Sequence, residues 1–422
     1  MRVVDNRLLL LSTATLLLLL NCGCHSASSM RHNTVIFGLN PALQRTIALL
    51  PPGLTPGAVN RGTRVDLGIG GKGQNAFVAA TCMGVSALPA LAQWVGKGPE
   101  GDMLLGLLGT KAAGFDEALT VRVDGRLRNA ITLLGAETTE VVEPSGQIAA
   151  AEVSALLERL QSKDNDGPKG LAFMGSVPKL DPPTAFYPLL ASALTTPRTI
   201  LLIDATEALS ATVTAARSRS AKMVIIKLNC REVLALVGLA RGGSESSSSS
   251  GDLIAEGCRR LSELVYANDE DSPSLSTSER GSEGATTTRV LVAATDGPFQ
   301  AHLIELHPTA RPGGSESPHY TFTMPPLPRA VENPIGAGDA VSSGTIMAAT
   351  GAVAGMTFLL ASLNNAAGAG SSGGREEGDV DVVSAFRWGL ACGAASCLSP
   401  SNSVFSRTDV EAIFRDILVS AA

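Results

Sequence analysis

Short apolar runs alternate with helix-like stretches through the middle of the chain. The runs have the length of buried strands, bounded by turn-forming residues. We predict strands at 34–39, 169–174, 199–204, 222–227 and 289–295, and helices at 150–161, 183–194 and about 207–218. Such strand–helix alternation implies a parallel sheet with helices on both faces. After residue 333 the pattern is mostly helical.

Two segments differ from this core pattern. Residues 45–66 mix Thr, Val, Arg, Pro and Gly and predict an exposed hairpin. Residues 119–149 are rich in Thr, Val, Ile and Arg with alternation, which favours a partly exposed antiparallel sheet. Between them, 88–110 predict a strand, a loop and a helix. We expect 45–66 and 119–149 to form a small β lid beside the main sheet.

Four segments lie outside the expected core. In residues 1–29, Arg2 and Arg7 precede an apolar run that is short for a membrane span and resembles a signal-peptide core. Either this leader delivers the protein to an organelle, or Met30 is the true start. Three further segments are rich in Ser, Gly and acidic residues, so we expect disordered surface insertions at about 241–251, 268–288 and 366–379.

Composition narrows the class of protein. Of the 422 residues, 45% are hydrophobic but only 4% aromatic, which suits an Ala/Leu/Val/Gly-rich core. The net charge is −6 with no dense basic block, so nothing points to nucleic acid, and phosphates would have to be bound by local groups. The seven cysteines form no CxxC pair, so we expect reduced thiols rather than a disulfide framework or a zinc site.

The stretch with the most evident chemistry is Asn333-Pro334-Ile335-Gly336-Ala337-Gly338-Asp339, which predicts a loop that opens a helix. The first N–H groups of a helix have no intrahelical partner and carry the positive end of the dipole, and glycines let a phosphate approach them. A carboxylate beside such a cradle suits phosphoryl transfer to a hydroxyl. The alternative is that Asp339 is only a helix-start residue.

A second glycine string precedes another helix-like stretch. Gly68, Gly70 and Gly73 formally satisfy G-x-G-x-x-G. A dinucleotide site is disfavoured because the preceding residues make a poor buried strand and no Asp or Glu occurs between Leu67 and Pro99. A P-loop is disfavoured because Lys72 is followed by glycine rather than Ser or Thr.

Four separated strings together resemble the ribokinase-like (pfkB) carbohydrate kinase family. They are Gly70-Gly71-Lys72-Gly73-Gln74-Asn75-Ala76, Gly175-Ser176-Val177-Pro178, Asn229-Cys230-Arg231-Glu232, and Asn333 to Asp339 with Gly344. The strings follow the family's order and spacing between about residues 34 and 410. Leu39-Asn40-Pro41-Ala42-Leu43 and Pro56-Gly57-Ala58-Val59-Asn60-Arg61 further resemble its sugar-phosphate branch, which contains 1-phosphofructokinase and tagatose-6-phosphate kinase.

This resemblance implies one kinase domain over residues 30–422, with a doubly wound α/β fold and a small β lid. It also implies transfer of the ATP γ-phosphate to a sugar hydroxyl. Asp339 is then the base that accepts the hydroxyl proton, and Gly336, Ala337 and Gly338 supply the N–H groups of an anion hole.

The resemblance also assigns the nucleotide and metal positions. Asn229 and Glu232 would organise Mg²⁺ and its waters, although a capped helix start explains the same pair. Lys227, at a strand end, would face the nucleotide phosphates. Thr295 and Gly297 would line the nucleotide site, although a plain turn would explain Gly297 almost as well.

The sugar would lie against the first glycine string and the lid. The resemblance places Asn40, Gly70, Gly71, Lys72 and Asn75 at the substrate. In the predicted lid, Arg128 matches an arginine that the branch places near the substrate, where a guanidinium suits a sugar phosphate. An exposed strand arginine is the alternative.

One position departs from the family pattern. Gln44 stands where an aspartate that binds sugar hydroxyls is usual. A carboxamide has one carbonyl acceptor, two donors and no charge, so it can bind a hydroxyl or a phosphate oxygen. The identity of the sugar therefore stays open, while the phosphoryl chemistry expected at Asp339 does not depend on this position.

The leading expectation is an ATP-dependent, 1-phosphofructokinase-like kinase of a sugar or sugar phosphate. Two alternatives are a kinase of an unphosphorylated sugar or nucleoside, and a weakly catalytic sugar-binding protein on the same fold. Potassium is a further candidate ion, and the lid is a candidate homodimer contact. We expect no nucleic-acid partner and no stable membrane insertion of the mature domain. The expected location is the cytoplasm, or an organelle such as a plastid if residues 1–29 are a leader.

Overall fold

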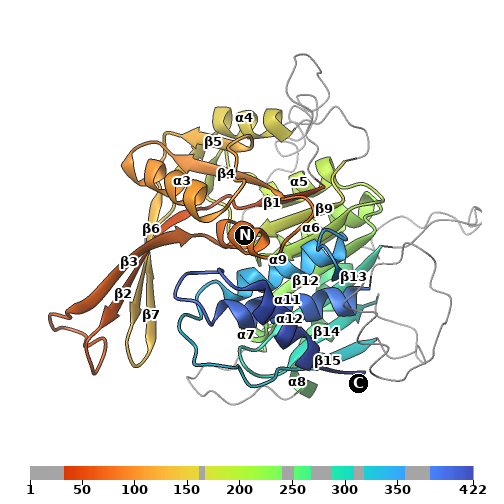
Figure 1. Cartoon of the computed structure of the whole chain (residues 1–422). Helices are drawn as coiled ribbons and strands as arrows, with labels where there is room; N and C mark the ends of the chain where they lie inside the picture. Colours follow the sequence, from red (N-terminus) through yellow and green to blue (C-terminus); the bar gives the residue numbers. More distant parts are fainter. Residues whose placement is uncertain are drawn as a thin grey trace, which may run out of the picture.

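The computed structural model describes residues 33–160, 167–239, 251–267, 288–307, 318–356 and 381–421. The predicted leader 1–29, and nearly all of 241–251, 268–288 and 366–379, lie outside these ranges. In the described part the chain forms one large sheet covered by helices, and a small sheet that projects from it (Figure 1). No helix in the described ranges combines the length and the apolar character needed to cross a membrane.

The strands of the large sheet are β1 Thr34–Phe37, β4 Ala90–Gly96, β5 Thr120–Val123, β9 Gly170–Met174, β11 Ile200–Asp204, β12 Met223–Asn229, β13 Arg289–Thr295, β14 Ala301–Leu306, β15 His319–Thr323 and β16 Leu418–Ala421. Their order is β16-β15-β14-β13-β12-β11-β9-β1-β4-β5. From β5 to β13 all neighbours pair in parallel, and β14 to β16 continue the sheet antiparallel. The predicted mostly parallel sheet is confirmed.

Helices cover both faces of this sheet. They are α2 Lys72–Cys82, α3 Pro99–Lys111, α4 Ala150–Leu160, α5 Phe186–Leu194, α6 Leu209–Ser218, α7 Cys230–Leu236, α8 Gly251–Tyr266, α9 Ala337–Ala349, α11 Val382–Ser396 and α12 Arg407–Asp416. Because strand side chains alternate between faces, Ile36 joins a core with α2, α3, α9, α11 and α12, whereas Val35 and Phe37 join a second core with α4 to α8.

The small sheet has the order β3-β2-β6-β7, formed by β2 Ala42–Leu49, β3 Gly62–Gly70, β6 Arg128–Leu134 and β7 Thr138–Val142. Both sequence segments expected in a lid contribute strands to it. A short pair, β8 Gln147–Ala149 with β10 Lys179–Asp181, forms a third sheet.

One sequence expectation is wrong, and some elements were not predicted. Residues 119–149 do not form one antiparallel sheet, because β5 is a parallel edge strand of the large sheet and β6 pairs in parallel with β2. The described chain after 333 is mostly helical, as expected, and β16 adds one short strand at the sheet edge. Strands β14 and β15 and helix α8 were not predicted, because long polar insertions beside them hide their short apolar pattern.

Candidate active site

Four charged side chains converge where the parallel strands end and two helices begin. Asp204 is the last residue of β11 and Lys227 lies near the end of β12, whereas Lys72 opens α2 and Asp339 lies in the first turn of α9. In open α/β sheets, ligands bind at this carboxyl edge of the strands. The topology therefore brings together residues that are far apart in the sequence.

The mouth of α9 is a helix start capped by glycine, in which the N–H of Ala337, expected in the anion hole, already has a backbone acceptor. Gly336 is the N-cap with φ 80°, and a Cβ there would stand 2.4 Å from Ser403 Oγ. The N–H of Ala337 bonds Pro334 O at 3.3 Å and that of Ala340 bonds Gly336 O at 2.9 Å. The N–H groups of Gly338 and Asp339 lie between them in the first turn, where an α-helix offers no acceptor. This turn is suited to an anion.

Asp339 is buried, and its carboxylate accepts a hydrogen bond from Asn75 Nδ2 at 2.9 Å. Burial and the nearby charge of Asp204 raise the pKa of Asp339 to about 7, against the opposing effects of Lys72, Asn75 and Lys227. A carboxylate with a pKa near neutrality is matched to general-base work. Asn75 Oδ1 is buried without a partner in the described structure, so it is free to accept from a substrate hydroxyl.

Two lysines share one carboxylate beside Asp339. Lys72 Nζ lies 2.6 Å from Asp204 Oδ1, and Lys227 Nζ lies 3.2 Å from Oδ2. Burial alone would raise the pKa of Asp204, but the two ammonium groups and hydrogen bonds hold it below its usual value. Burial acts to lower the pKa of Lys72, yet Asp204, Asp339 and Glu232 together raise it above its ordinary value. Asp204, Asp339 and Lys72 are therefore charged at pH 8.

Asn229 and Glu232 form a complete capping box at the start of α7. Asn229 N donates to Glu232 Oε2, and Glu232 N donates to Asn229 Oδ1, both at 2.8 Å. The pair thus does form a helix cap. Glu232 Oε1, however, takes no part in the capping box and lies 3.7 Å from Lys72 Nζ. A capped start fixes a carboxylate oxygen at the strand edge, so the structural and metal-binding roles are compatible.

The donor set fits a magnesium–nucleotide complex better than a free metal ion. In the described ranges no group of three or more His, Cys, Asp or Glu side chains could hold a metal by itself. Mg²⁺ usually takes one or two carboxylates together with substrate phosphates and waters. Glu232, with Asn229 beside it, would supply the protein side of such a site, and bound Mg²⁺ would neutralise phosphate charge.

Thr295 and Gly297, predicted to line a nucleotide site, lie at the neighbouring strand. Thr295 ends β13 in register with Asn229, and Gly297 has φ 56° in the turn that follows. A cavity of about 260 Å³ opens at this turn, lined by Asp296, Pro298, Phe299, Gln300, His302, Thr323 and Met324. Neither Thr295 nor Gly297 contacts the charged cluster, so their assignment stays a prediction.

The loops expected to bind the substrate meet at Asn40, next to the small sheet. Asn40 Nδ2 donates to Ser176 Oγ at 2.9 Å, and Arg128 Nη2 donates to Asn40 O at 2.9 Å. Arg128 Nε is buried without an acceptor in the described structure. Gly71, with φ 100°, and Gly70 lead directly into α2. Arg128 is thus bound to the loop that follows β1 and is not a freely exposed strand arginine.

Gln44 lies on β2 rather than in the charged cluster. Its Nε2 donates to Thr132 Oγ1 at 2.7 Å, and its Oε1 would stand 3.2 Å from a Cβ on Gly70. The carboxamide is therefore held by the small sheet with its acceptor toward the first glycine string. Nothing in the structure ties Gln44 directly to Asp339.

Sequence reasoning missed Asp204 and Ser342. Ser342 Oγ donates to Asp204 Oδ2 at 2.6 Å from within α9. The available signal was an aspartate at the end of a buried strand, the position from which side chains reach a ligand crevice. Among the predicted residues, Lys72, Lys227 and Glu232 are linked by ion pairs through Asp204, whereas Asn75 and Asp339 form a hydrogen-bonded pair of their own.

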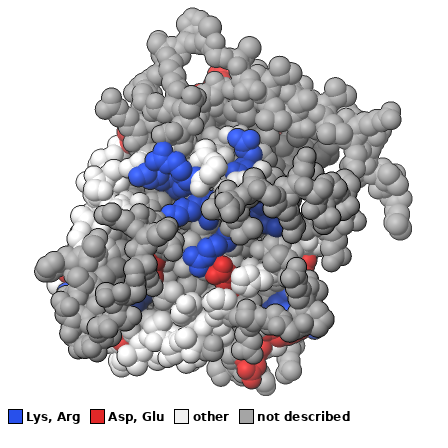
Figure 2. Space-filling view, turned by 90° about the vertical axis from the view of Figure 1, so that its right-hand side faces the viewer, with Lys and Arg blue, Asp and Glu red and all other residues white. Residues whose placement is uncertain are grey.

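Positively charged side chains also gather on a part of the surface away from this site. Lysines and arginines precede or open several parallel strands, namely Lys169, Arg198, Lys222 and Arg289. Figure 2 shows Lys and Arg side chains gathered on the side away from the small sheet, with few acidic side chains among them. This arrangement lies away from the small sheet and the loops described above.

Comparisons with known proteins place the fold. Scans against protein-family models and curated proteins find no match. The chain is similar to phosphofructokinase-2 from Escherichia coli in complex with substrates and products, with TM-score 0.58, 20% identity, and coverage of 90% of this chain and 98% of that one. It is also similar to that enzyme in complex with potassium (TM-score 0.56, 19% identity, 91% and 98% covered). Ribokinase from Thermotoga maritima matches with TM-score 0.54, 14% identity, and 91% and 99% covered. The chain therefore has the fold of the ribokinase-like carbohydrate kinases.

Proposed function

We propose that this chain, with its ribokinase-like fold, is an ATP-dependent kinase that phosphorylates a hydroxyl of a sugar or sugar phosphate. The observation that carries the proposal is the buried Asp339, whose carboxylate shares the mouth of α9 with two ammonium groups and receives a hydrogen bond from Asn75. A base, an anion-binding helix turn and positive charge in one place are what phosphoryl transfer to an alcohol requires.

Each residue has a distinct task in this proposal. Asn75 orients Asp339 and accepts from the substrate through Oδ1, and Asp339 takes the hydroxyl proton. The N–H groups at Gly338 and Asp339 and the ammonium groups of Lys72 and Lys227 stabilise charge on the phosphoryl oxygens. Glu232, with its helix cap completed by Asn229, would hold Mg²⁺ through water. ATP supplies the transferred group and ADP leaves.

A sugar phosphate of the kind used by 1-phosphofructokinase is the preferred acceptor. Arg128 supports this choice because its guanidinium is bound to Asn40 O on one side and keeps a buried, unpartnered Nε on the other. Burial lowers the pKa of Arg128, and an anion beside it would compensate that cost. Gln44 would serve as a neutral acceptor for a sugar hydroxyl.

The test is an ADP-release assay on residues 30–422 with Mg²⁺-ATP. The acceptors are fructose-1-phosphate, fructose-6-phosphate, tagatose-6-phosphate, fructose, ribose and adenosine. Turnover on a phosphorylated ketose is expected. Turnover only on an unphosphorylated sugar or adenosine would keep the chemistry and overturn the substrate class. ATP binding without turnover on any acceptor would favour a weakly catalytic binding protein. Adding KCl tests potassium in the same assay.

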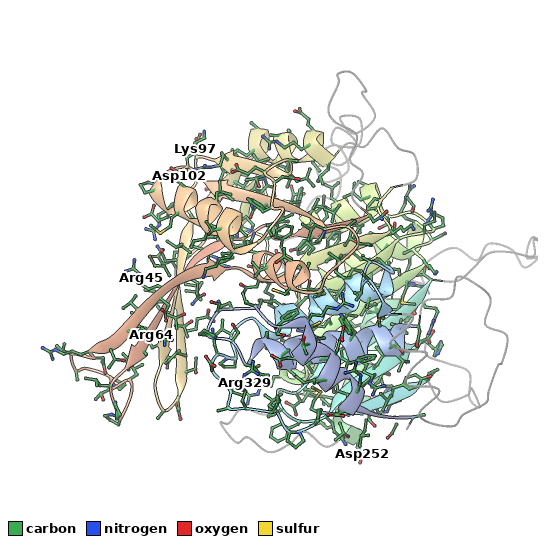
Figure 3. The ribbon with its side chains drawn as sticks, viewed as in Figure 1. Arg45, Arg64, Lys97, Asp102, Asp252 and Arg329 are labelled. Carbon is green, nitrogen blue, oxygen red and sulfur yellow. The ribbon has the colours of Figure 1, made fainter. Side chains whose placement is uncertain are left out.

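The small sheet is proposed to serve as a lid and as a homodimer contact. Strand pairing puts Arg45, Leu67, Ile131 and Val141 in one row on one face, with Val65 in the next row. Val65 and Val141 are 57% and 52% exposed, and Arg45 and Arg64 lie along the projecting part of the sheet (Figure 3). An apolar exposed sheet face suits a second copy. Light scattering of Val65→Asp beside the parent chain tests this, and a monomeric parent would refute it.

A further inference from the structure

Asp204 has no task in the reaction proposed above, although it is the common partner of the cluster. Its side chain is fully buried at the end of β11. Three side chains from three elements bond it: Lys72 from α2, Lys227 from β12 and Ser342 from α9. One carboxylate thus fixes the relative positions of a strand end and two helix starts.

Lys227 depends on this carboxylate for its position. Its side chain is 5% exposed, and within the described ranges no other carboxylate lies within ion-pair distance. A buried ammonium group without a counter-ion is costly and tends to move toward water. Lys72 has only Glu232, at 3.7 Å, as a second ion-pair partner. Removing the charge of Asp204 would therefore release both ammonium groups from their positions and leave the charge of Asp339 to attract them.

The place where Asp204 holds Lys227 is the mouth of α9. A Cβ on Gly338 would stand 3.0 Å from Lys227 Nζ, so the ammonium group lies against the first helical turn. The same turn carries Asp339, whose charge also acts on Lys72. Lys227 is therefore held at the spot where phosphoryl charge would be stabilised, and Lys72 is bound to the other oxygen of the same carboxylate.

We propose that Asp204 is a positioning residue that holds the ammonium groups of Lys72 and Lys227 at the N-terminus of α9, where they face the transferred phosphoryl group. This inference rests on the proposed kinase function. Asp204 does not touch the reacting atoms and acts only through the two lysines. Ser342 orients the carboxylate by donating to Oδ2.

Asp204 also acts on Asp339 through its charge, which gives a readout that a merely structural role would not move. The groups facing Asp339 are Asp204 from β11, Lys72 and Asn75 from α2, and Lys227 from β12. Asp204 is the member of this set that raises the pKa of Asp339. The acid limb of the pH–rate profile is the loss of activity at low pH as the proposed base takes up a proton. An uncharged residue at 204 should therefore move this acid limb to lower pH.

The test compares Asp204→Asn with Asp124→Asn, the same change at an exposed ion pair with Lys97. For Asp204→Asn we expect kcat to fall about 10- to 100-fold, KM for ATP to change less than about threefold, and the acid limb to shift to lower pH. Asp124→Asn should match the parent chain. If kcat per folded molecule and the acid limb of Asp204→Asn both equal the parent values, the proposal is wrong.

Two further measurements keep the outcome decisive. If Asp204→Asn does not fold, Ser342→Ala replaces it, since it removes the donor to Asp204 and no charge. A fall in kcat of at least about threefold without a shift of the acid limb is then expected, and an unchanged kcat would contradict the proposal. If the parent chain turns over no acceptor, the proposed function fails separately. Crystal structures of the parent and the variant then decide whether either lysine ammonium group moves, and two unmoved ammonium groups would refute the positioning role.

Discussion

An Asp339→Asn variant removes the proposed base and keeps the shape of its side chain. Asn75 can still donate to the remaining oxygen, so the loop geometry should persist. Loss of a general base costs about 10²–10⁴-fold in rate, which corresponds to about 3–5 kcal/mol of transition-state stabilisation. The turnover of the variant should fall by that factor, with a smaller change in the KM for ATP.

The same variant should be more stable than the parent chain at alkaline pH. The pKa of Asp339 is raised from 3.8 to about 7, so the folded state binds a proton more tightly than the unfolded state. The free energy of unfolding therefore falls as pH rises from about 4 to about 7, and the full loss is present above pH 7. Each pKa unit is about 1.4 kcal/mol, which sets an upper limit of about 4 kcal/mol. Asparagine does not carry this cost.

The measurement is denaturant unfolding of both proteins at pH 5 and pH 8.5, beside the ADP-release assay. The stability advantage of Asp339→Asn should be larger at pH 8.5, whereas Asp124→Asn should show no such trend because Asp124 is exposed. Near-parental turnover would refute the base assignment. An advantage that does not grow with pH would refute the raised pKa, even if activity is lost.

Three other perturbations test separate parts of the site. Gly338→Ala places a methyl group 3.0 Å from Lys227 Nζ, so kcat should fall about 10- to 100-fold with little change in melting temperature; parental kcat would contradict this close approach. Asn75→Ala removes the donor to Asp339, which should raise the pKa of that carboxyl further and move the acid limb of the pH–rate profile to higher pH. The KM for the sugar should also rise, and an acid limb that does not move would count against the contact. Glu232→Gln keeps the acceptor for the helix cap but loses charge, so half-maximal activity should need about 10- to 100-fold more Mg²⁺, and a parental Mg²⁺ titration would exclude Glu232 from the metal site. Chelation of Mg²⁺ with EDTA should abolish turnover in every active variant.

The sequence predicted the regular part of the fold well because each short element carried its own pattern. The run Ile200–Asp204 is wholly buried and bounded by polar residues, so periodicity alone located it. By contrast, β5 and β6 are strands of similar composition that join different sheets. Their partners are set by long-range packing, which a local pattern does not encode.

The candidate site was predictable only where the residues that act together also lie together in the sequence. The glycines and Asp339 share one helix start, so their roles followed from local geometry. Asp204 is bonded to residues of two helices and another strand, and no spacing in the sequence indicates that these residues come together. The pair Asn229 and Glu232 fits a cap and a metal site equally well, and the structure shows that it is at least a cap.

The strands of the small sheet do not all pair with their neighbours in the sequence. Its strand β2 pairs with β3, which follows closely in sequence, and with β6, which joins it only after β4, α3 and β5 have been made. During synthesis of the chain, one edge of the β2–β3 hairpin therefore stays unpaired until β6 has been made. Open edges are sites for mispairing with other chains, and non-local pairing slows folding. Gln44 and Thr132, which are buried and bond each other between β2 and β6, then close that edge, and β7 adds to the far side of β6.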